Sequence, residues 1–240
     1  MCTVTYLPRE DGFVLCSNRD ESPSRGVPEL SREVRGQQEL LYPRDPLRGG
    51  TWLALSSSGR VACVLNGAFV RHRHRPPYRK SRGLVVLESF DYLRLEEFFQ
   101  GYNLQGIEPF TLICVERGRL WEFRWDGRRR HLKARDAEAP AIWSSATLYP
   151  PEIQARREAW FRDWLRGRTD FSAGAVRHFH KHGGEPDPWN GFVMNRHDRV
   201  RTVSISCIEA GPKGATFHYE DLLQGQVQVL SLDFRTPVTA

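Results

Sequence analysis

Residues 1–22 read MCTVTYLPREDGFVLCSNRDES, and this stretch predicts the first element of the fold. Two runs of β-branched, aromatic or aliphatic residues flank a Pro-Arg-Glu-Asp-Gly segment with the composition of a turn, which is typical of a β-hairpin. With an ordinary short loop, the numbers of paired residues sum to about 19 or 20. Cys2 is then expected opposite Ser17 or Asn18, beside the polar run of residues 18–21.

Cys2 is a candidate nucleophile. Methionine is usually removed before a small residue such as cysteine, which would leave Cys2 with a free α-amine of reference pKa roughly 7.7 to 8.0, a base on the same residue as the thiol. Arg19 and Asp20 would lie beside it, the guanidinium favouring the thiolate and the carboxylate holding the ammonium or the guanidinium. The alternative is a chance cysteine near a frayed terminus, followed by a solvated charged turn.

Composition narrows the class of protein. The 240 residues suffice for one large domain or two small ones, and 40% hydrophobic residues with seven Trp and thirteen Phe support a packed core. No run approaches the roughly 18 apolar residues of a membrane span, and the amino terminus lacks a signal-peptide pattern. The five cysteines include no C-x-x-C pair, so we expect reduced, buried thiols in a soluble, cytoplasmic protein without a membrane span.

The net charge of +6 is concentrated in the basic loop, residues 71–82 (RHRHRPPYRKSR), with a second cluster at residues 128–130. No RRM, KH, zinc-finger or helix-turn-helix pattern accompanies this charge, so we expect no nucleic-acid partner. Two interpretations remain open: a solvated loop, or a binding loop for an anionic small-molecule substrate.

Hydrophobic periodicity and turn residues predict the other elements. Strands are expected at residues 51–55, 61–65, 110–116, 120–125, 141–143, 191–195, 201–209, 215–219 and 227–234, and helices at 84–90, 93–99, 151–165 and from the N-cap Ser172 to His182. Neither a linker nor a repeat divides the chain, so we expect a single domain over residues 1–240. The pattern predicts an α+β fold in which two antiparallel sheets pack together and helices cover the outside.

Three histidines, His178, His180 and His182, raise the question of a metal or haem site. On a helix only His178 and His182 share a face, and no cysteine or carboxylate nearby has ligand spacing. We therefore expect a solvated helix end, no metal site and no cofactor.

Six short segments carry a family resemblance: Met1-Cys2-Thr3-Val4, Ser17-Asn18-Arg19-Asp20-Glu21, Gly49-Gly50-Thr51-Trp52-Leu53-Ala54, Asn66-Gly67, Ser81-Arg82-Gly83 and Ser144-Ser145-Ala146-Thr147-Leu148. They resemble the NRDE family, also called the Transport and Golgi organisation 2 family, and the resemblance covers essentially the whole chain. That family is similar, more distantly, to N-terminal nucleophile hydrolases of the choloylglycine hydrolase and acid ceramidase type. This similarity implies an αββα sandwich and an N-terminal cysteine that attacks a linear amide.

The resemblance implies roles for five residues. Cys2 matches the nucleophile, Arg19 the arginine beside it, and Asp20 the aspartate near the α-amine. Asn66 matches the asparagine that supplies an oxyanion contact, and Arg201 is a weaker match to the late arginine that completes the site.

One position departs from the hydrolase pattern. Where those enzymes have a second asparagine in the oxyanion hole, this chain has Ser144 or Ser145. A hydroxyl donates one hydrogen bond, whereas loss of a single well-placed donor costs about 10²- to 10³-fold in rate. Asn18, Glu21 and Trp52 complete the predicted oxyanion and substrate-binding set.

Together these features predict a cysteine amidohydrolase that acts on a non-peptide linear amide, with a small-molecule substrate bearing an acid group or an acyl chain. The resemblance also implies an alternative, because the family has links to haem movement and lipid metabolism: a non-catalytic carrier of haem or acyl lipid. The missing second asparagine favours the carrier, whereas the joint presence of Cys2, Arg19, Asp20 and Asn66 favours the enzyme.

Overall fold

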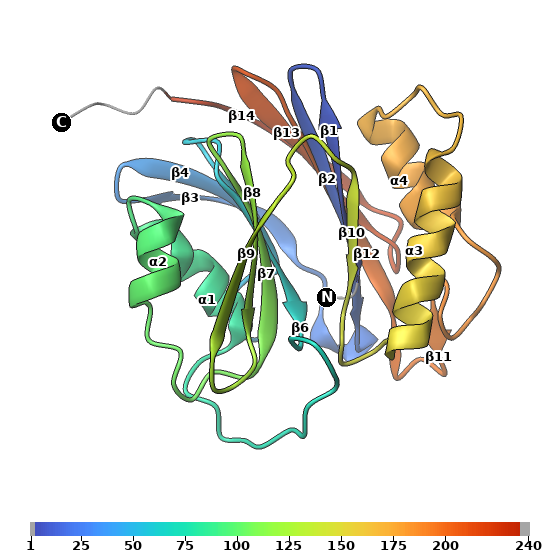
Figure 1. Ribbon diagram of the computed structural model, residues 1–240, viewed down its shortest axis with the longest axis horizontal. Coiled ribbons are helices and arrows are strands. Elements are labelled where there is room, and N and C mark those ends of the chain that lie inside the picture. Colours follow the sequence, from blue (N-terminus) through green and yellow to red (C-terminus); the bar gives the residue numbers. More distant parts are fainter. Residues whose placement is uncertain (1–2, 236–240) are drawn as a thin grey trace.

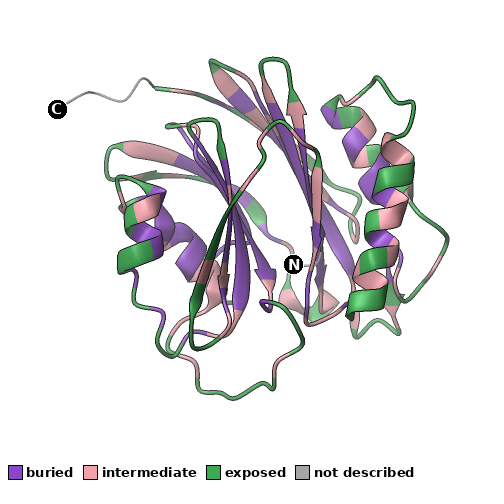
Figure 2. Ribbon diagram, viewed as in Figure 1, coloured by how far each residue is buried: buried purple, intermediate pink, exposed green. Residues whose placement is uncertain are grey.

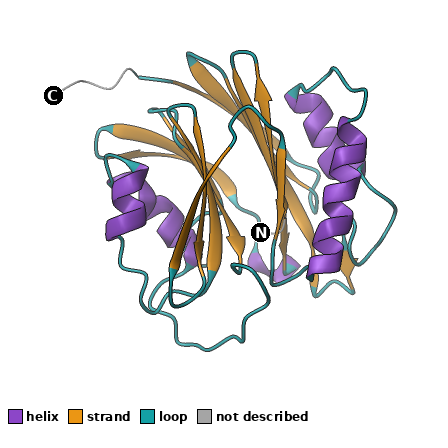
Figure 3. Cartoon of the chain, viewed as in Figure 1, coloured by secondary structure: helices purple, strands orange, loops and turns teal. Residues whose placement is uncertain are grey.

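The computed structural model describes residues 3–235 as four layers (Figure 1). Two antiparallel sheets face each other, and helices cover the outer side of each (Figure 3). Helices α1 (Arg82–Glu88) and α2 (Leu95–Gly101) lie on one outer face, and α3 (Pro151–Leu165) and α4 (Ala173–His182) on the other. The predicted αββα arrangement is therefore confirmed. Within residues 3–235 no helix is both long and apolar enough to cross a membrane.

The first sheet has the order β10-β1-β2-β12-β13-β14, with β11 also paired to β12. Its strands are β1 (Thr3–Arg9), β2 (Gly12–Glu21), β10 (Ala141–Ser144), β11 (Asn195–Arg196), β12 (Val200–Ala210), β13 (Gly214–Asp221) and β14 (Val227–Asp233). Strand β1 thus lies between β2 and β10, and Thr3 pairs with both Asn18 and Ser144. This pairing holds the start of β1 in the interior of the sheet.

The second sheet runs in sequence order from β3 to β9. Its strands are β3 (Glu29–Arg35), β4 (Gln38–Arg44), β5 (Leu53–Ser56), β6 (Val61–Asn66), β7 (Phe110–Glu116), β8 (Arg119–Trp125) and β9 (Arg130–Arg135). Every neighbouring pair is antiparallel. Short connections suffice for such a sheet, except after β6, where the chain leaves through the basic loop and returns by α1 and α2.

The central strands are buried along much of their length (Figure 2), and β2 shows why they are apolar on both faces. Phe13 and Leu15 join the apolar cluster that the two sheets share, while Val14 and Cys16 join the cluster beneath α3 and α4. Because side chains alternate along a strand, a strand covered on both sides must be apolar at every position. The polar residues that follow Cys16 alternate between the same two sides.

Helix boundaries follow the predicted end signals. The Ser172 hydroxyl accepts a hydrogen bond from the Ala175 N–H and begins α4, and α4 ends at His182 before Gly183. Pro151 occupies the first turn of α3, where its missing N–H costs nothing. Phe161 and Phe179 of these helices pack against the first sheet with ring centroids 5.6 Å apart.

Two predictions about strands are wrong. The hairpin partners sum to 21, from Thr3 with Asn18 to Arg9 with Gly12, because the strands continue to a two-residue turn. Of the strand predicted at residues 191–195, only Asn195 lies in a strand, the two-residue β11.

Three strands were not predicted: β3, β4 and β9. Strands β3 and β9 are the two edges of the second sheet, and charged side chains interrupt their apolar pattern. Charged edge strands resist pairing with other chains, but the same charges hide the strand periodicity in the sequence.

Candidate functional site

A cavity of about 760 Å³ opens where β2 and β6 end and the basic loop begins. Its wall combines segments distant in sequence: the end of β2, residues 45–52, the end of β6, the basic loop and the start of α1. The lining residues used below are Arg19, Glu21, Arg25, Asp45, Arg48, Gly50, Trp52, Asn66, His74, Arg79, Lys80, Arg82, Gly83 and Glu108. Four predicted site residues therefore line one cavity: Arg19, Glu21, Trp52 and Asn66.

The predicted nucleophile Cys2 lies outside the described residues. Thr3, its covalent neighbour, begins β1 and pairs with Asn18 on β2, which precedes the cavity residue Arg19.

Arg19 is a buried cation at the cavity wall, only 3% exposed. Its Nη2 lies 3.0 Å from Asp45 Oδ2, and its guanidinium lies 4.4 Å from the ring centroid of Trp52. Burial lowers the pKa of Arg19, against the opposing effect of Glu21 and Asp45. Its Nη1 is buried and, among residues 3–235, has no hydrogen-bond partner, so one face of the guanidinium has unused donor capacity.

Asp20 points to the other side of the sheet, as strand alternation requires. Its carboxylate accepts a hydrogen bond from the Thr202 hydroxyl at 2.6 Å and another from the Tyr149 hydroxyl at 2.6 Å. A β-bulge between Thr202 and Ser204 interrupts β12 at this point, since Thr202 pairs with Asp20 and Ser204 with Arg19. Arg19 and Asp20 thus occupy opposite faces of one strand, and Asp20 is held by two hydroxyl groups that the sequence did not indicate.

Asn18 also faces the helices instead of lining the cavity. Its Nδ2 donates to the backbone oxygens of Phe192, at 2.6 Å, and His180, at 3.0 Å. Its Oδ1 contacts His180 Nδ1, and the other ring nitrogen of His180 lies 2.7 Å from the Thr5 hydroxyl. The contacts with His180 thus hold the Asn18 side chain against α4.

The expectation of a solvated helix end is wrong for His180, which is fully buried. Burial, with a smaller contribution from Arg157, lowers the pKa of His180 to about 3 and keeps the ring neutral. The residues before it explain the error: Val176, Phe179 and His180 lie on the buried face of α4, and His178 lies on the exposed face.

Asn66 ends β6 and lines the cavity, and the serines predicted to assist it lie close by. The Ser145 hydroxyl donates to the Asn66 backbone oxygen at 2.9 Å and lies 3.0 Å from the Thr147 hydroxyl. Ser144 pairs with Thr3 through the strand ladder. The Ser145 hydroxyl therefore donates its proton to the backbone of Asn66 and does not offer it to an oxyanion.

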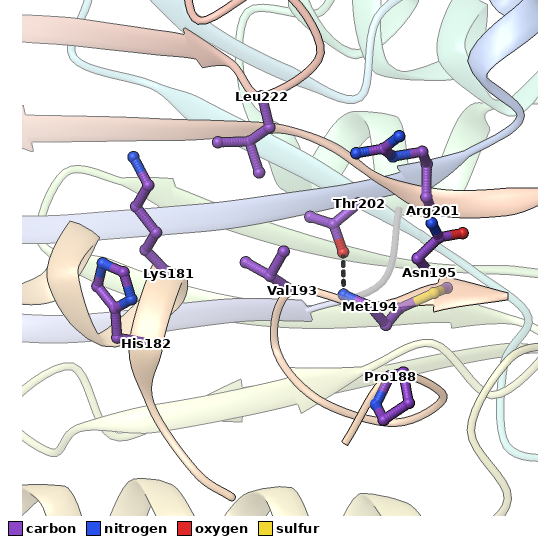
Figure 4. A pocket seen from close by; sticks show the side chains of 9 residues that line it. All are labelled: Lys181, His182, Pro188, Val193, Met194, Asn195, Arg201, Thr202 and Leu222. Carbon is purple, nitrogen blue, oxygen red and sulfur yellow. Dashed lines mark hydrogen bonds between the residues drawn. The ribbon is translucent and has the colours of Figure 1, made fainter. Parts of the chain in front are cut away.

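Arg201 lies at a second, smaller cavity of about 440 Å³ (Figure 4). Its guanidinium is 3.6 Å from Asp198, and the same cavity is lined by Lys181, Val193 and Thr202, among others. The structure does not bring Arg201 to the larger cavity. Thr202, which lines this smaller cavity, donates its hydroxyl to Asp20 and accepts a hydrogen bond from the Met194 N–H at 2.9 Å.

Two glycine-containing segments build one wall of the large cavity. A Cβ on Gly50 would lie 2.5 Å from the Gly83 carbonyl carbon, and the Thr51 N–H donates to the Gly83 oxygen at 3.2 Å. Real Cβ atoms do not approach so closely, so this backbone contact requires glycine. Gly50 and Gly83 belong to two of the segments that carry the family resemblance.

Sequence reasoning missed Asp45, Glu108 and Arg48 as cavity residues. Each lies in or near a turn and belongs to no motif, and a charged residue in such a position usually faces solvent. Only the packing of these loops against β2 and β6 brings them to the site.

The sequence matches the family model described as Transport and Golgi organisation 2 over residues 1–144. No curated protein matches it at the sequence level. Among solved structures it is similar to a mutant of the conjugated bile acid hydrolase from Clostridium perfringens, with a TM-score of 0.55 and 10% identity, over 100% of this chain and 98% of that one. It is similar to the Caenorhabditis elegans N-acylethanolamine-hydrolyzing acid amidase ortholog, with a TM-score of 0.57 and 11% identity, over 86% of this chain and 92% of that one.

These matches confirm the resemblance that the sequence motifs indicated. The family match covers more than half of the chain. The structural matches cover 86–100% of it, and because the sequence identity is only 10–11%, they are evidence for the fold alone. The chain belongs to the Transport and Golgi organisation 2 family and has the αββα fold of the N-terminal nucleophile hydrolases.

Proposed function

We propose that this protein is a cysteine amidohydrolase of the N-terminal nucleophile type, acting on a linear amide that is not a peptide. One observation supports the proposal most directly. In this fold Arg19 and Asn66 line the same cavity, and Thr3, the neighbour of Cys2, pairs with Asn18, the residue before Arg19. The structural relatives named above are hydrolases of a conjugated bile acid and of N-acylethanolamines.

The proposed reaction has two stages. The Cys2 thiolate attacks the acyl carbon, the C–N bond breaks, and the amine leaves with the proton that the Cys2 α-amine took from the thiol. Water then hydrolyses the thioester, which releases the acyl group as a carboxylic acid and restores the thiol. Arg19 stabilises the thiolate through its charge, and the Asn66 side chain donates to the oxyanion. Asp20, which accepts hydrogen bonds from Thr202 and Tyr149, holds the α-amine of Cys2 in place.

The test compares the processed protein with Cys2→Ala and with a protein carrying a two-residue Gly-Ser extension before Cys2. A panel of N-acyl amines is incubated with each, and products are measured by mass spectrometry. We expect turnover by the processed wild type, a loss of activity of at least about 10³-fold in both variants, and unchanged circular dichroism spectra. The matched control carries the same extension after Ala240 and keeps full activity.

Full turnover by the variant extended before Cys2 would contradict the mechanism, because its α-amine would no longer belong to the cysteine.

A second candidate function is a carrier of acyl lipid or haem in the same cavity. The observation that favours it is the engaged hydroxyl of Ser145, which leaves Asn66 with one fewer neighbouring donor than the hydrolase pattern expects. Tight stoichiometric binding of a fatty acyl ligand or haem that survives Cys2→Ala, without turnover of any amide, would favour the carrier over the enzyme.

A further inference from the structure

The large cavity carries an excess of positive charge. Among residues 3–235, six permanently cationic side chains line it (Arg19, Arg25, Arg48, Arg79, Lys80 and Arg82), against three carboxylates (Glu21, Asp45 and Glu108). Two members of the basic loop that line it, Arg79 and Lys80, lie beside the cis-linked pair Pro76-Pro77. The same loop therefore contributes both a wall and charge.

The three carboxylates of the cavity contact arginine and histidine side chains. Asp45 lies 3.0 Å from Arg19 and 3.1 Å from Arg25. Glu108 lies 3.0 Å from Arg82, 3.0 Å from His72 and 3.2 Å from His74. Arg25 also lies 3.0 Å from Glu21, so the three acids together offset the charges of Arg19, Arg25 and Arg82 and leave the other cations of the cavity in excess.

Two cations of the cavity, Arg48 and Arg79, make no ion pair among the described residues. The Arg79 guanidinium donates to the backbone oxygens of Gln105, at 3.0 Å, and Asn103. Carbonyl oxygens satisfy donors without neutralising charge. Arg19 adds a buried Nη1 with no partner in residues 3–235. Lys80, by contrast, is paired with Glu88 at 2.5 Å.

We infer that the substrate of this cavity carries an oxyanion, a carboxylate, phosphate or sulfonate, which Arg48, Arg79 and the Nη1 group of Arg19 bind. The inference rests on the proposed function, because it assigns the substrate class of the same site. Guanidinium groups match the planar or trigonal oxygen arrangement of such anions, and a cleft with one sign of charge raises the local concentration of the opposite charge.

The first experiment compares two alkylating reagents of similar size at Cys2, anionic iodoacetate and neutral iodoacetamide. With either, the thiolate sulfur forms the new C–S bond and iodide leaves. Rates at Cys2 are followed by peptide mass spectrometry. The ratio of the iodoacetate rate to the iodoacetamide rate is compared with the same ratio for a cysteine peptide. We expect the ratio to exceed the peptide's by about tenfold and to fall in 1 M salt, where the Debye length is about 3 Å.

The variant Arg48→Ala/Arg79→Ala removes two of the uncompensated cations without touching the buried wall. We expect it to lower the ratio by at least about threefold. The matched control is Arg73→Ala, which changes an exposed arginine of the same basic loop that does not line the cavity. A ratio equal to that of the peptide, or one that the double variant leaves unchanged, would overturn the inference.

A binding measurement tests the anion site without relying on Cys2. Inorganic pyrophosphate is titrated calorimetrically into the wild type, the double variant and Arg73→Ala, and we expect the double variant alone to lose at least about fivefold in affinity. Equal affinity in all three proteins would overturn the inference. A Cys2 that reacts with neither reagent, beside intact pyrophosphate binding that needs Arg48 and Arg79, would reject the proposed hydrolase and retain the anion site.

Discussion

Two neighbouring residues of β2 illustrate how one position along a strand changes a residue's role. Arg19 faces the second sheet, where it contacts Asp45 and Trp52, and Asp20 faces the helices, where Tyr149 and Thr202 donate to it. The side-chain period of two fixes this separation once the strand is formed. Arg19 therefore lines the cavity, while Asp20 lies on the opposite face of the same strand.

At the same scale, His180 makes stability depend on pH. In the folded protein burial lowers its pKa from 6.5 to about 3, so below pH 6.5 the unfolded chain binds a proton that the folded chain does not. Its contribution to stability is complete above pH 6.5 and is lost as pH falls towards 3, by about 2 kcal/mol at pH 5.

Urea unfolding at pH 7.5 and pH 5.0 tests this prediction. We expect the loss of unfolding free energy between the two pH values to be about 2 kcal/mol smaller in His180→Gln than in the wild type. The exposed His178→Gln, on the same helix, should behave as the wild type does. An unchanged acid loss in His180→Gln would show that other groups cause it.

At the scale of elements, the cavity depends on a backbone contact between the turn before β5 and the first turn of α1. Gly50 and Gly83 pack without side chains between them, and the Thr51 N–H donates to Gly83. The Ser81 hydroxyl caps α1 by accepting from the Leu84 N–H at 3.3 Å. The cap and the glycine contact together set where the helix begins, and so where Arg82 meets Glu108.

The substitution Gly50→Ala tests that contact. The added Cβ would meet backbone atoms of Gly83 at 2.5 Å, so we expect a loss of about 1–3 kcal/mol in unfolding free energy. Gly174→Ala, on α4, is the control: its Cβ would come no closer than 3.8 Å to the Ser172 hydroxyl, and the change should be neutral or slightly stabilising. Equal effects of both substitutions in urea unfolding would argue against a tight wall.

At the scale of the whole molecule, the apolar residues form two clusters divided by the first sheet. Cys63 and Cys114 belong to the cluster that the sheets share, and Cys16 and Cys207 to the cluster beneath α3 and α4. Burial raises the pKa of the Cys63 thiol to about 12 and raises that of Cys16 as well, in part through the neighbouring Cys207. All four thiols are 0–1% exposed and therefore report on opening of the core.

If residues 1–240 form a single cooperative domain, these four thiols become reactive only on global unfolding. We expect native-state labelling to give the same opening free energy for all four within about 1 kcal/mol, equal to the value from urea unfolding. A lower value for Cys16 and Cys207 alone would show that the layer of α3 and α4 opens by itself.

The sequence by itself determined most of the local elements and the family. Hydrophobic alternation, turn residues and helix caps act over a few residues. They therefore indicated the β1–β2 hairpin, both ends of α3, and the polar run that follows Cys16. Arg19, Trp52 and Asn66 were predicted as site residues, and they line one cavity.

Only the tertiary structure decided what depends on distant segments. Asp20 meets Thr202 across 182 residues, His180 is buried by contacts with β1 and β2, and Arg201 lies at the smaller cavity. The bulge in β12 and the edge positions of β3 and β9 follow from sheet pairing, which local composition does not encode. From the sequence, charged residues such as Asp45 and Glu108 are expected to face solvent. They line the cavity only because the packing of the loops buries these particular charges.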